Sequence, residues 1–536
     1  MNTFLLQHLL THSAANFPDR EAVVFKDQSL TYAELERQSN QLANNLCRHG
    51  VRAGDRVGIM LNKSIETIVG IFGILKAGAA YVPVDPALPA GRIIYILKNT
   101  DIAILLTSLL CLKKNVQELR REDTLLRKII VTDVSLSAMG EEKSLADFIS
   151  WKQVLEEERE TCPALTVSDV SPAYILHTSG STGLPKGVVI SHLNALAFVN
   201  MAAEFFQVNE EDRFCNHAPI NFDLSIFDIF VAMRCGAAVV LVPENLSLFP
   251  MKLAEHIEQT RITVWNSVSS VLSMLASRGK LDRFDFTSLR LFIFSGEILP
   301  IKYLRIAKKY MLNTEFYNIY GQTEANSSTY YKIVDIPDSD AWKIPIGKPF
   351  PNFDVFAIND DKKVICSPGE EGELYVKSAT VALGYWRDPS KTSEKFLIDP
   401  RDPDSFNIVY RTGDLVQIGD DGNINFLGRK DHQIKSRGYR IELGEIEIVL
   451  NSIPEIKHAA VVPLPDDLIG HRIMACVSLV EGVVIDSKDI YSYCSKTLPK
   501  YMIPESMIFL AELPQTANGK IDREKLLKIV AEGNRS

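Results

Sequence analysis

The chain has 536 residues, 46% of them apolar and 23% charged, with a formal net charge of −9. Its length suggests roughly two to four domains, and its acidic balance argues against a general nucleic-acid-binding protein, which usually carries a basic surface. The N-terminus lacks the basic and apolar regions of a signal peptide, and the apolar run 102–112 is too short to span a bilayer. We expect a soluble, cytoplasmic protein, monomeric, that binds neither nucleic acid nor membrane. The eight cysteines form no C-x-x-C pair or zinc-like spacing, so we expect them to be reduced and structural.

The first clear element is a helix within residues 29–50. Thr31 and Glu34 form a capping-box pattern at its start, and Gly50 suits its end. Apolar residues at helical spacing share one face: Leu35, Leu42, Ala43 and Leu46.

Short apolar runs then alternate with helical patterns along the chain. They cover residues 56–60, 173–176, 237–242, 262–265 and 289–294. This alternation predicts an α/β fold with parallel strands covered by helices. Polar segments follow several runs, notably Ser295-Gly296-Glu297 and residues 321–324. Ligands gather at the carboxyl ends of such strands, so we expect these segments to converge on one crevice.

The composition changes near residue 430, where charged residues and glycine become frequent. Two strand-like runs follow, at residues 458–464 and 472–480, before a helical end. We therefore predict a large N-terminal α/β domain over residues 1–429, a hinge over 430–432 and a small α+β domain over 433–536.

The segment HTSGSTGLPKGV, residues 177–188, indicates an anion-binding loop. Glycine lets backbone amides approach a ligand, the hydroxyls of serine and threonine add donors, and Lys186 adds a cation. The loop is not a Walker sequence, because Pro185 stands where the second glycine belongs. The alternative is a flexible Gly/Ser linker.

Nine segments in order resemble the adenylate-forming superfamily of acyl-CoA ligases, luciferases and nonribosomal peptide synthetase adenylation domains. They are LTYAEL, LKAGAAYVPVDP, YILHTSGSTGLPKGV, FDLSIFD, NIYGQTE, GELYV, YRTGDL, GRKDHQIKSRGYRIELGEIE and NGKIDR. The resemblance spans nearly the whole chain. It implies a large adenylation core of layered sheets and helices, with a small mobile C-terminal domain.

The resemblance also implies an ATP site with Mg²⁺. In it the loop wraps the β- and γ-phosphates, Tyr320 stacks on adenine, Thr323 holds a phosphate oxygen, Asp414 binds the ribose hydroxyls and Arg429 lies near ribose or phosphate. The residues assigned to ATP are Thr178, Ser179, Gly180, Ser181, Thr182, Gly183, Lys186, Asn318, Ile319, Tyr320, Gly321, Thr323, Asp414, Arg429 and Lys435. The chain departs from the family pattern at two positions. His177 replaces Tyr, which we interpret as a packing change. Gln322 replaces Pro, which predicts a less rigid loop.

The implied reaction centre comprises Lys520, Thr323 and Glu324. Glu324 would bind Mg²⁺, which prefers a carboxylate together with phosphate oxygens. Lys520 would bridge the substrate carboxylate and the α-phosphate and stabilise the developing charge. Asp431 matches the hinge residue, and Gly438 lies where the family's pantetheine arm passes. Taken singly, each residue has an ordinary alternative: a core tyrosine, a solvated glutamate, a Gly-Asp turn or a surface lysine.

The same resemblance assigns the substrate pocket. Asp223 would pair with an α-ammonium group, because an unpaired buried charge is costly; the alternative is that it caps a helix beginning near Ser225. The remaining positions are Leu224, Phe227, Asn266, Ile293, Ser295, Gly296, Ile319, Ser327, Ser328 and Lys520. This lining contains no acid or base for a charged side chain, so we expect a small or medium neutral amino acid: alanine, serine, proline or glycine.

The expected activity is formation of aminoacyl-AMP and pyrophosphate, then transfer to a phosphopantetheine thiol. No carrier or condensation motif occurs, so we expect a free-standing enzyme that loads a separate carrier protein. Some segments are closest to D-alanine–carrier protein ligases and others to prolyl-loading enzymes. The sequence also leaves open an acyl- or aryl-CoA ligase, which Asp223 argues against, and a nucleotide-binding regulator, against which Lys520, Glu324 and Asp414 argue.

Overall fold

A computed structural model describes residues 3–122, 124–133, 142, 145–180, 182–431, 433–516 and 521–533 of the chain. Within these residues, no helix combines the length and the apolar character that crossing a bilayer requires. All eight cysteines lie in the described part and are free thiols.

The first sheet has eight strands and supports the glycine-rich loop. Its order is β19 (Gly384–Tyr385), β9 (Lys186–Ser191), β8 (Pro172–Thr178), β4 (Ala80–Pro83), β3 (Arg56–Met60), β5 (Ile104–Thr107), β6 (Lys128–Val131) and β7 (Asp147–Ser150). The strands from β8 to β7 pair in parallel, whereas β9 is antiparallel to both β8 and β19. The loop 179–185 therefore connects two antiparallel neighbours.

The second sheet has nine strands and supplies most of the candidate site. Its order is β16 (Lys348–Pro349), β15 (Asn326–Ile333), β14 (Glu315–Gln322), β13 (Leu291–Ser295), β12 (Val264–Val268), β10 (Arg213–Asn216), β11 (Ala238–Leu241), β1 (Glu21–Phe25) and β2 (Gln28–Thr31). The strands from β14 to β1 pair in parallel. The predicted α/β class with parallel strands is therefore confirmed.

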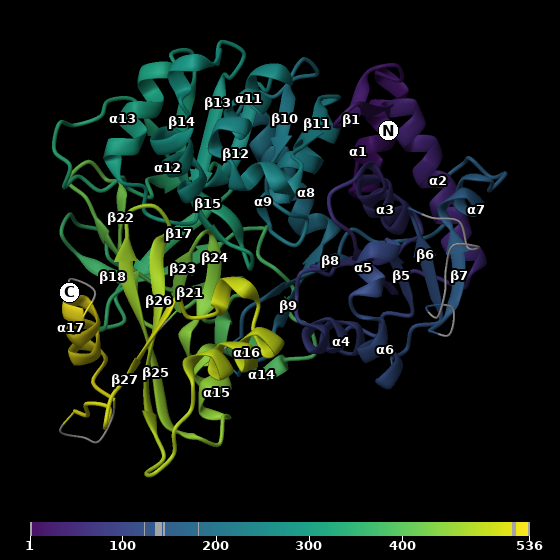
Figure 1. Ribbon diagram of the computed structural model, residues 1–536. Helices are drawn as coiled ribbons and strands as arrows, with labels where there is room; N and C mark the ends of the chain where they lie inside the picture. Colours follow the sequence, from purple (N-terminus) through teal and green to yellow (C-terminus); the bar gives the residue numbers. More distant parts are fainter. Residues whose placement is uncertain are drawn as a thin grey trace.

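Helices lie between and outside these sheets (Figure 1). The main core joins both sheets through α1 (Gln7–Asn16), α2 (Tyr32–Arg48), α3 (Ile65–Lys76) and α8 (His192–Phe205). A second core packs the nine-stranded sheet against α11 (Pro250–Gln259), α12 (Ser269–Arg278) and α13 (Ile301–Tyr310). A third packs the eight-stranded sheet against α4 (Ala90–Asn99), α5 (Leu109–Lys113) and α6 (Val116–Arg121). Both sheets are thus covered on two faces, as parallel sheets require.

The predicted N-terminal helix is α2. Thr31 and Glu34 form the capping box, and the face with Leu35, Leu42, Ala43 and Leu46 is buried in the main core. This face stabilises the contact with α3 between the sheets.

A third sheet completes the N-terminal part. It contains β17 (Asp354–Ile358), β18 (Glu371–Lys377), β21 (Ile408–Ile418) and β20 (Phe396–Ile398), with β22 (Ile424–Arg429) paired to β21. Two shorter helices also belong to the N-terminal part. In chain order α7 (Trp151–Leu155) lies between β7 and β8, and α14 (Pro389–Lys395) lies between β19 and β20.

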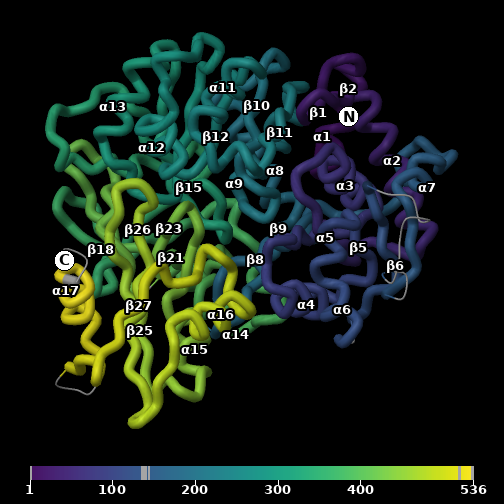
Figure 2. The backbone as a smooth tube through the Cα atoms, viewed as in Figure 1, coloured from purple at the N-terminus to yellow at the C-terminus, as the bar shows by residue number. Residues whose placement is uncertain are grey.

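The C-terminal part begins with the hairpin of β23 (Gln433–Ser436) and β24 (Tyr439–Glu442). A three-stranded sheet follows, with β25 (Ile456–Asp466), β26 (Gly470–Leu479) and β27 (Ser506–Phe509), together with α15 (Leu443–Asn451), α16 (Ser487–Thr497) and α17 (Arg523–Gly533). These elements lie against the N-terminal layers, with α1 and α17 on opposite sides of the molecule (Figure 2). The predicted hinge directly follows β22; the division into domains stays a prediction.

Candidate functional site

A cavity of about 780 Å³ lies where strands of the nine-stranded sheet end beside the glycine-rich loop. Thr178 at the end of β8, Val268 at the end of β12, Ser295 at the end of β13 and Tyr320 in β14 all line it. Residues of the β23–β24 hairpin close the cavity from the C-terminal part. The predicted convergence of the polar segments on one crevice is therefore what the structure shows.

Asp223 lies in this cavity, just before the short helix α9 (Leu224–Ile226). Its side chain makes no capping hydrogen bond and instead accepts one from the Thr323 hydroxyl at 2.9 Å. Burial raises the pKa of the Asp223 carboxyl, while the Thr323 hydroxyl and the charge of Lys435 act in the opposite direction. A buried carboxylate of this kind is stabilised by a cationic ligand.

The wall beside Asp223 is apolar. Phe206, Phe227, Phe350, Ile293 and Ile319 are buried residues that line the cavity. Phe227 begins a π-helical stretch, Phe227–Val231, that continues α9 into α10 (Ala232–Cys235). Such wide turns frequently occur at functional sites.

The amide of Asn266 is already bonded to the protein. Its Nδ2 atom donates to Oδ1 of Asp228 at 3.2 Å and to the Leu224 carbonyl at 3.3 Å. Asn216 donates to the other oxygen of Asp228 at 3.0 Å. Burial raises the pKa of Asp228 to about 8, against the effect of these two amides. The donor group of Asn266 is therefore engaged below the cavity.

The remaining predicted pocket positions fall into two groups. Leu224, Ser295, Gly296 and Ser327 line the cavity. Ser328 is fully buried, does not line it, and donates its hydroxyl to the Asn326 carbonyl at 3.2 Å. The antiparallel pairing of β15 with β14 turns Ser328 away from the site.

The glycine-rich loop contacts the C-terminal part through several donors. Ser179 donates its hydroxyl to the Arg440 carbonyl at 2.7 Å, and the Gly180 amide donates to Oε2 of Glu445 at 3.3 Å. A Cβ atom at Gly180 would lie 2.1 Å from the Leu184 carbonyl oxygen, so this turn requires glycine. Thr182 instead contacts the N-terminal part, where its hydroxyl accepts a hydrogen bond from Lys391 of α14 at 3.3 Å.

Glu324 is fully buried between two cations. Its Oε1 atom lies 3.2 Å from Nζ of Lys186 and accepts a bond from the Tyr385 hydroxyl at 2.8 Å, while Oε2 accepts one from Arg440 at 2.8 Å. Burial opposes ionisation, but the charges of Arg440 and Lys186 outweigh it and hold the pKa of Glu324 well below its usual range. Burial lowers the pKa of Lys186 to about 8, with Arg440 acting in the same direction.

Both oxygens of Glu324 are thus engaged by protein donors. Mg²⁺ requires free carboxylate oxygens and nearly octahedral geometry. In the described part of the chain, no group of three or more His, Cys, Asp or Glu side chains is arranged to hold a metal ion. In this arrangement of the two parts, the residues around Glu324 do not fit Mg²⁺.

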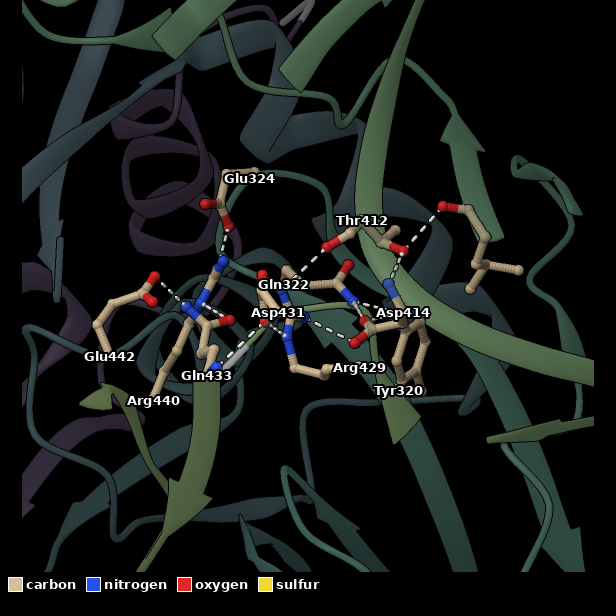
Figure 3. Close-up of polar contacts among 11 residues, drawn as sticks. Tyr320, Gln322, Glu324, Thr412, Asp414, Arg429, Asp431, Gln433, Arg440 and Glu442 are labelled. Atoms are coloured by element: carbon tan, nitrogen blue, oxygen red, sulfur yellow. Dashed lines mark hydrogen bonds and ion pairs between the residues drawn. The ribbon is translucent and has the colours of Figure 1, made fainter. Parts of the chain in front are cut away.

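A second polar network joins β14 to β21 and β22 (Figure 3). Asp414 accepts hydrogen bonds from the Tyr320 hydroxyl, from Gln322 at 2.8 Å and from Arg429 at 2.7 Å. Gln322 also donates to the Tyr320 hydroxyl. The amide of Gln322 therefore links Tyr320 to Asp414. The sequence predicted only that Gln322, in place of Pro, makes the loop less rigid, and it did not predict this link. Asn318, Ile319 and Gly321, from the same strand, also line the cavity.

The predicted hinge and Lys435 lie beside this network. Asp431 is ion-paired with Arg429, with its Oδ1 atom 2.6 Å from Nε of Arg429. Lys435 reaches the cavity from β23, and burial lowers its pKa although Asp414 and Asp223 act in the opposite direction. The charge of Lys435 therefore acts on both of these carboxylates.

Gly438 lies at the tip of the hairpin against the N-terminal part. Its amide donates to Oε1 of Glu297 at 2.7 Å, and a Cβ atom there would lie 2.4 Å from Cγ1 of Val268. Only glycine fits this approach without a shift of Val268. The Tyr439 ring packs edge-on against Phe222 and stacks on Tyr501.

Three positions of interest lie outside the described residues: Lys520, Ser181 and His432. The described residues on either side of Lys520 include Gln515 and Ile521, which form an isolated bridge with each other. Neither lines the cavity. In this arrangement the hairpin, and not this pair, faces the site.

His177 lies below the loop at the end of β8. Both ring nitrogens are buried without a hydrogen-bond partner, and burial lowers the pKa of His177 to about 4. His177 also lines the cavity. Its interpretation as a packing residue stays a prediction.

Sequence reasoning missed four residues that this geometry brings forward: Tyr385, Asp228, Arg440 and Glu445. Arg440 and Glu445 stand in the charged segment 428–447, so a signal was present. Tyr385 bonds to Glu324 across 61 positions of sequence, and nothing local indicates that contact.

Two family models match most of the chain. One, described as AMP-binding enzyme, matches residues 10–386, and the other, described as AMP-binding enzyme C-terminal domain, matches residues 445–520.

Relatives of similar length are 35% identical to the chain. One is an L-proline–[L-prolyl-carrier protein] ligase of Pseudomonas fluorescens, with 98% of this chain and 99% of that protein covered. Another, with the same description, comes from Streptomyces coelicolor and has 96% and 94% covered. Tyrocidine synthase 3 of Brevibacillus parabrevis is 37% identical over 97% of the chain, which spans only 8% of that much longer protein.

A solved structure supports the same relationship. The Vibrio cholerae adenylation domain AlmE, in complex with glycyl-adenosine-5'-phosphate, superposes with a TM-score of 0.85 at 25% identity. The match covers 99% of this chain and 98% of that one.

Proposed function

The chain belongs to the AMP-binding enzyme family and is an ATP-dependent amino acid adenylation enzyme, and we propose that its substrate is L-proline. It would convert proline and ATP into prolyl-AMP and pyrophosphate. It would then transfer the prolyl group to the phosphopantetheine thiol of a carrier protein, with release of AMP.

Asp223 is the observation that carries the amino acid assignment. An amino acid presents an ammonium group beside its carboxylate, and a buried ammonium needs an anionic partner. Asp223 offers a carboxylate that burial destabilises and that the Thr323 hydroxyl orients. An acyl- or aryl-CoA ligase has no need for this carboxylate.

The apolar wall favours proline over serine, glycine and alanine. Phe206, Phe227 and Phe350 would contact a ring of methylene groups, which gains free energy by leaving water. A seryl hydroxyl would require a partner there, and the Nδ2 group of Asn266 cannot donate to it because Asp228 and the Leu224 carbonyl already accept from that group. Glycine and alanine would leave part of the wall without contacts. The two prolyl-carrier protein ligases support the same choice.

The roles proposed for the remaining residues follow the reaction. The proline carboxylate attacks the α-phosphorus and pyrophosphate leaves, so positioning and electrostatic stabilisation supply the catalysis. Thr178, Ser179, Gly180, Ser181, Thr182, Gly183, Lys186 and Thr323 would hold the phosphates. Tyr320 would stack on adenine, Asp414 and Arg429 would bind the ribose, and Lys520 would bridge the carboxylate and the α-phosphate.

The second step is proposed to use the arrangement described above. The thiol would attack the prolyl carbonyl carbon and AMP would leave, with the pantetheine arm passing Gly438. Rotation about Asp431 would exchange this arrangement for one in which Lys520 reaches the site. We also propose that the reaction requires Mg²⁺ and that Glu324 binds it. Both proposals apply to the arrangement in which Lys520 reaches the site. The cytoplasmic location and the monomeric state stay predictions.

Carrier loading tests the complete proposal. The protein is incubated with ATP, Mg²⁺, L-proline and a prolyl-accepting carrier protein that bears phosphopantetheine, and the intact mass of the carrier is measured. We expect the carrier to gain one prolyl group, and no gain when its phosphopantetheine serine is replaced by alanine. Formation of prolyl-CoA from free coenzyme A, without loading of the carrier, would assign the chain to the CoA ligases instead.

A further inference from the structure

The carboxylate of Asp414 is almost fully engaged by other side chains. Its Oδ2 atom accepts one hydrogen bond from the Tyr320 hydroxyl and a second from Nε2 of Gln322 at 2.8 Å (Figure 3). Its Oδ1 atom accepts one from Nη1 of Arg429 at 2.7 Å. A carboxylate offers about four lone pairs, two on each oxygen. Oδ2 is therefore saturated, while the contacts among the described residues leave one position open on Oδ1.

The orientation of the Gln322 amide is fixed by this contact. Nε2 also donates to the Tyr320 hydroxyl, whereas Oε1 is buried with no hydrogen-bond partner in the described part of the chain. Leaving a buried acceptor unpaired costs free energy. Turning the amide over would bring Oε1 against the Asp414 carboxylate, where two acceptors would face each other. Proline, the residue of the family pattern at this position, has no side-chain donor and could not make this bond.

Arg429 is held in place on Oδ1 of Asp414 by two further contacts. Its Nε atom lies 2.6 Å from Oδ1 of Asp431, and its Nη2 atom donates to the Thr412 carbonyl at 3.3 Å. Asp414 itself lines the cavity, together with Tyr320 and Gln322. A ligand in the cavity therefore meets an Asp414 carboxylate with one acceptor position to offer.

We propose that Gln322 is a positioning residue that limits Asp414 to a single ribose hydroxyl, so that the protein accepts an adenine nucleotide lacking the other hydroxyl. This inference rests on the ribose contact proposed above for Asp414. The two neighbouring hydroxyls of a ribose could otherwise each donate to one oxygen of the carboxylate. Because Tyr320 and Gln322 saturate Oδ2, only the hydroxyl that reaches Oδ1 gains a charged acceptor.

Equilibrium binding of AMP, 2'-deoxy-AMP and 3'-deoxy-AMP tests this selectivity. Isothermal titration calorimetry measures the three Kd values in the absence of amino acid, Mg²⁺ and carrier. In the unmodified protein we expect one deoxynucleotide to bind about tenfold more weakly than AMP, because it loses a bond to a charged acceptor, and the other to bind within about threefold of AMP. The weaker of the two identifies the hydroxyl that Asp414 binds.

Gln322→Met keeps the length of the side chain and removes both of its polar atoms. One position on Oδ2 becomes free, so both hydroxyls can donate to Asp414, and we expect both deoxynucleotides to bind about tenfold more weakly than AMP. The ratios are taken within each variant, so a general loss of affinity, as from a shift of the Tyr320 ring, cancels. Gln322→Pro should have the same effect and carries the test if circular dichroism shows that Gln322→Met is not folded.

The matched control is Gln417→Met. Gln417 lies in β21, the same strand as Asp414, but its amide donates to the Gly369 carbonyl at 3.3 Å and it does not line the cavity. The same atoms are removed from a neighbouring part of the strand, so the ratios of the three Kd values should equal those of the unmodified protein.

Two results would overturn the inference alone. They are similar Kd values for the two deoxynucleotides in the unmodified protein, and unchanged ratios in the folded Gln322 variants. Asp414→Ala tests the ribose contact on which the inference rests: an unchanged Kd for AMP in this variant would remove Asp414 from ribose binding. The titrations contain no amino acid and no carrier, so their outcome is independent of whether proline is the substrate.

Discussion

Replacing Asp223 by alanine is expected to lower kcat/KM for proline-dependent pyrophosphate exchange by about a hundredfold or more. The loss arises because the ammonium group of the substrate would be buried without its anionic partner. Asp223→Asn keeps the size of the side chain and its bond to Thr323 while removing the charge, so it should lose nearly as much. Exchange of labelled pyrophosphate into ATP, measured over a range of proline concentrations, provides kcat/KM.

A substrate without the amine separates this role from a general defect. Cyclopentanecarboxylate retains the ring and the carboxylate, and Asp223→Ala should use it as well as the unchanged protein does. Asp361→Ala, on the exposed surface, serves as the matched control and should have no effect. Equal losses with proline and with cyclopentanecarboxylate would remove Asp223 from ammonium recognition.

Replacing Lys520 by alanine is expected to lower prolyl-AMP formation by about a hundred- to a thousandfold. The amine would stabilise the charge that develops as the carboxylate oxygen attacks phosphorus, so its loss affects the transition state of the first step. Transfer of the prolyl group from chemically prepared prolyl-AMP to the carrier should stay close to normal. Rapid-quench measurement of each half-reaction separates the two effects.

The control for Lys520 is Lys525→Ala, an exposed lysine in α17. Lys525→Ala removes one positive charge, as Lys520→Ala does, but leaves the proposed reaction centre intact. It should affect neither half-reaction. Unchanged prolyl-AMP formation in Lys520→Ala would exclude this lysine from the chemistry. Equal losses in both half-reactions would assign it a role in folding or in adenylate binding instead.

Local signals predicted much of the fold. The capping box of Thr31 and Glu34, and the apolar face between them and Gly50, define α2 because helix ends and periodicity are properties of neighbouring residues. The run 262–265 predicted a strand too early: β12 covers Val264–Val268. The strand continues through the polar residues Asn266 and Ser267, which are buried within the sheet. Their polar character hid the true end of the strand from a reading based on apolar runs.

The π-helical stretch 227–231 could not be predicted. Its apolar residues, including Phe227, suit an ordinary buried helix equally well, and tertiary packing decides the wider turn. Ser327 and Ser328 were both placed in the pocket by the family resemblance, but with the register of β15 against β14 only Ser327 of these two lines the cavity.

The charged segment 428–447 shows where sequence reasoning stops. Its composition predicted the boundary near residue 430, and the family resemblance, not the composition, assigned roles to Lys435 and Gly438. The partners of Arg440 and Glu445 are Glu324 and the Gly180 amide, more than a hundred residues away. Those contacts depend on the orientation of the C-terminal part relative to the N-terminal part. The residues next to Arg440 and Glu445 in the sequence carry no signal of that orientation.

The most direct test of the central claim is ATP–pyrophosphate exchange by the unmodified protein across a panel of acids. The panel contains L- and D-proline, glycine, the alanine enantiomers and serine, with cyclopentanecarboxylate and aryl acids as controls. We expect the highest kcat/KM for L-proline and little exchange with acids that lack the amine. Preferential exchange with an acid that lacks an amine would contradict the role of Asp223, and preference for serine or glycine would contradict the role of the aromatic wall.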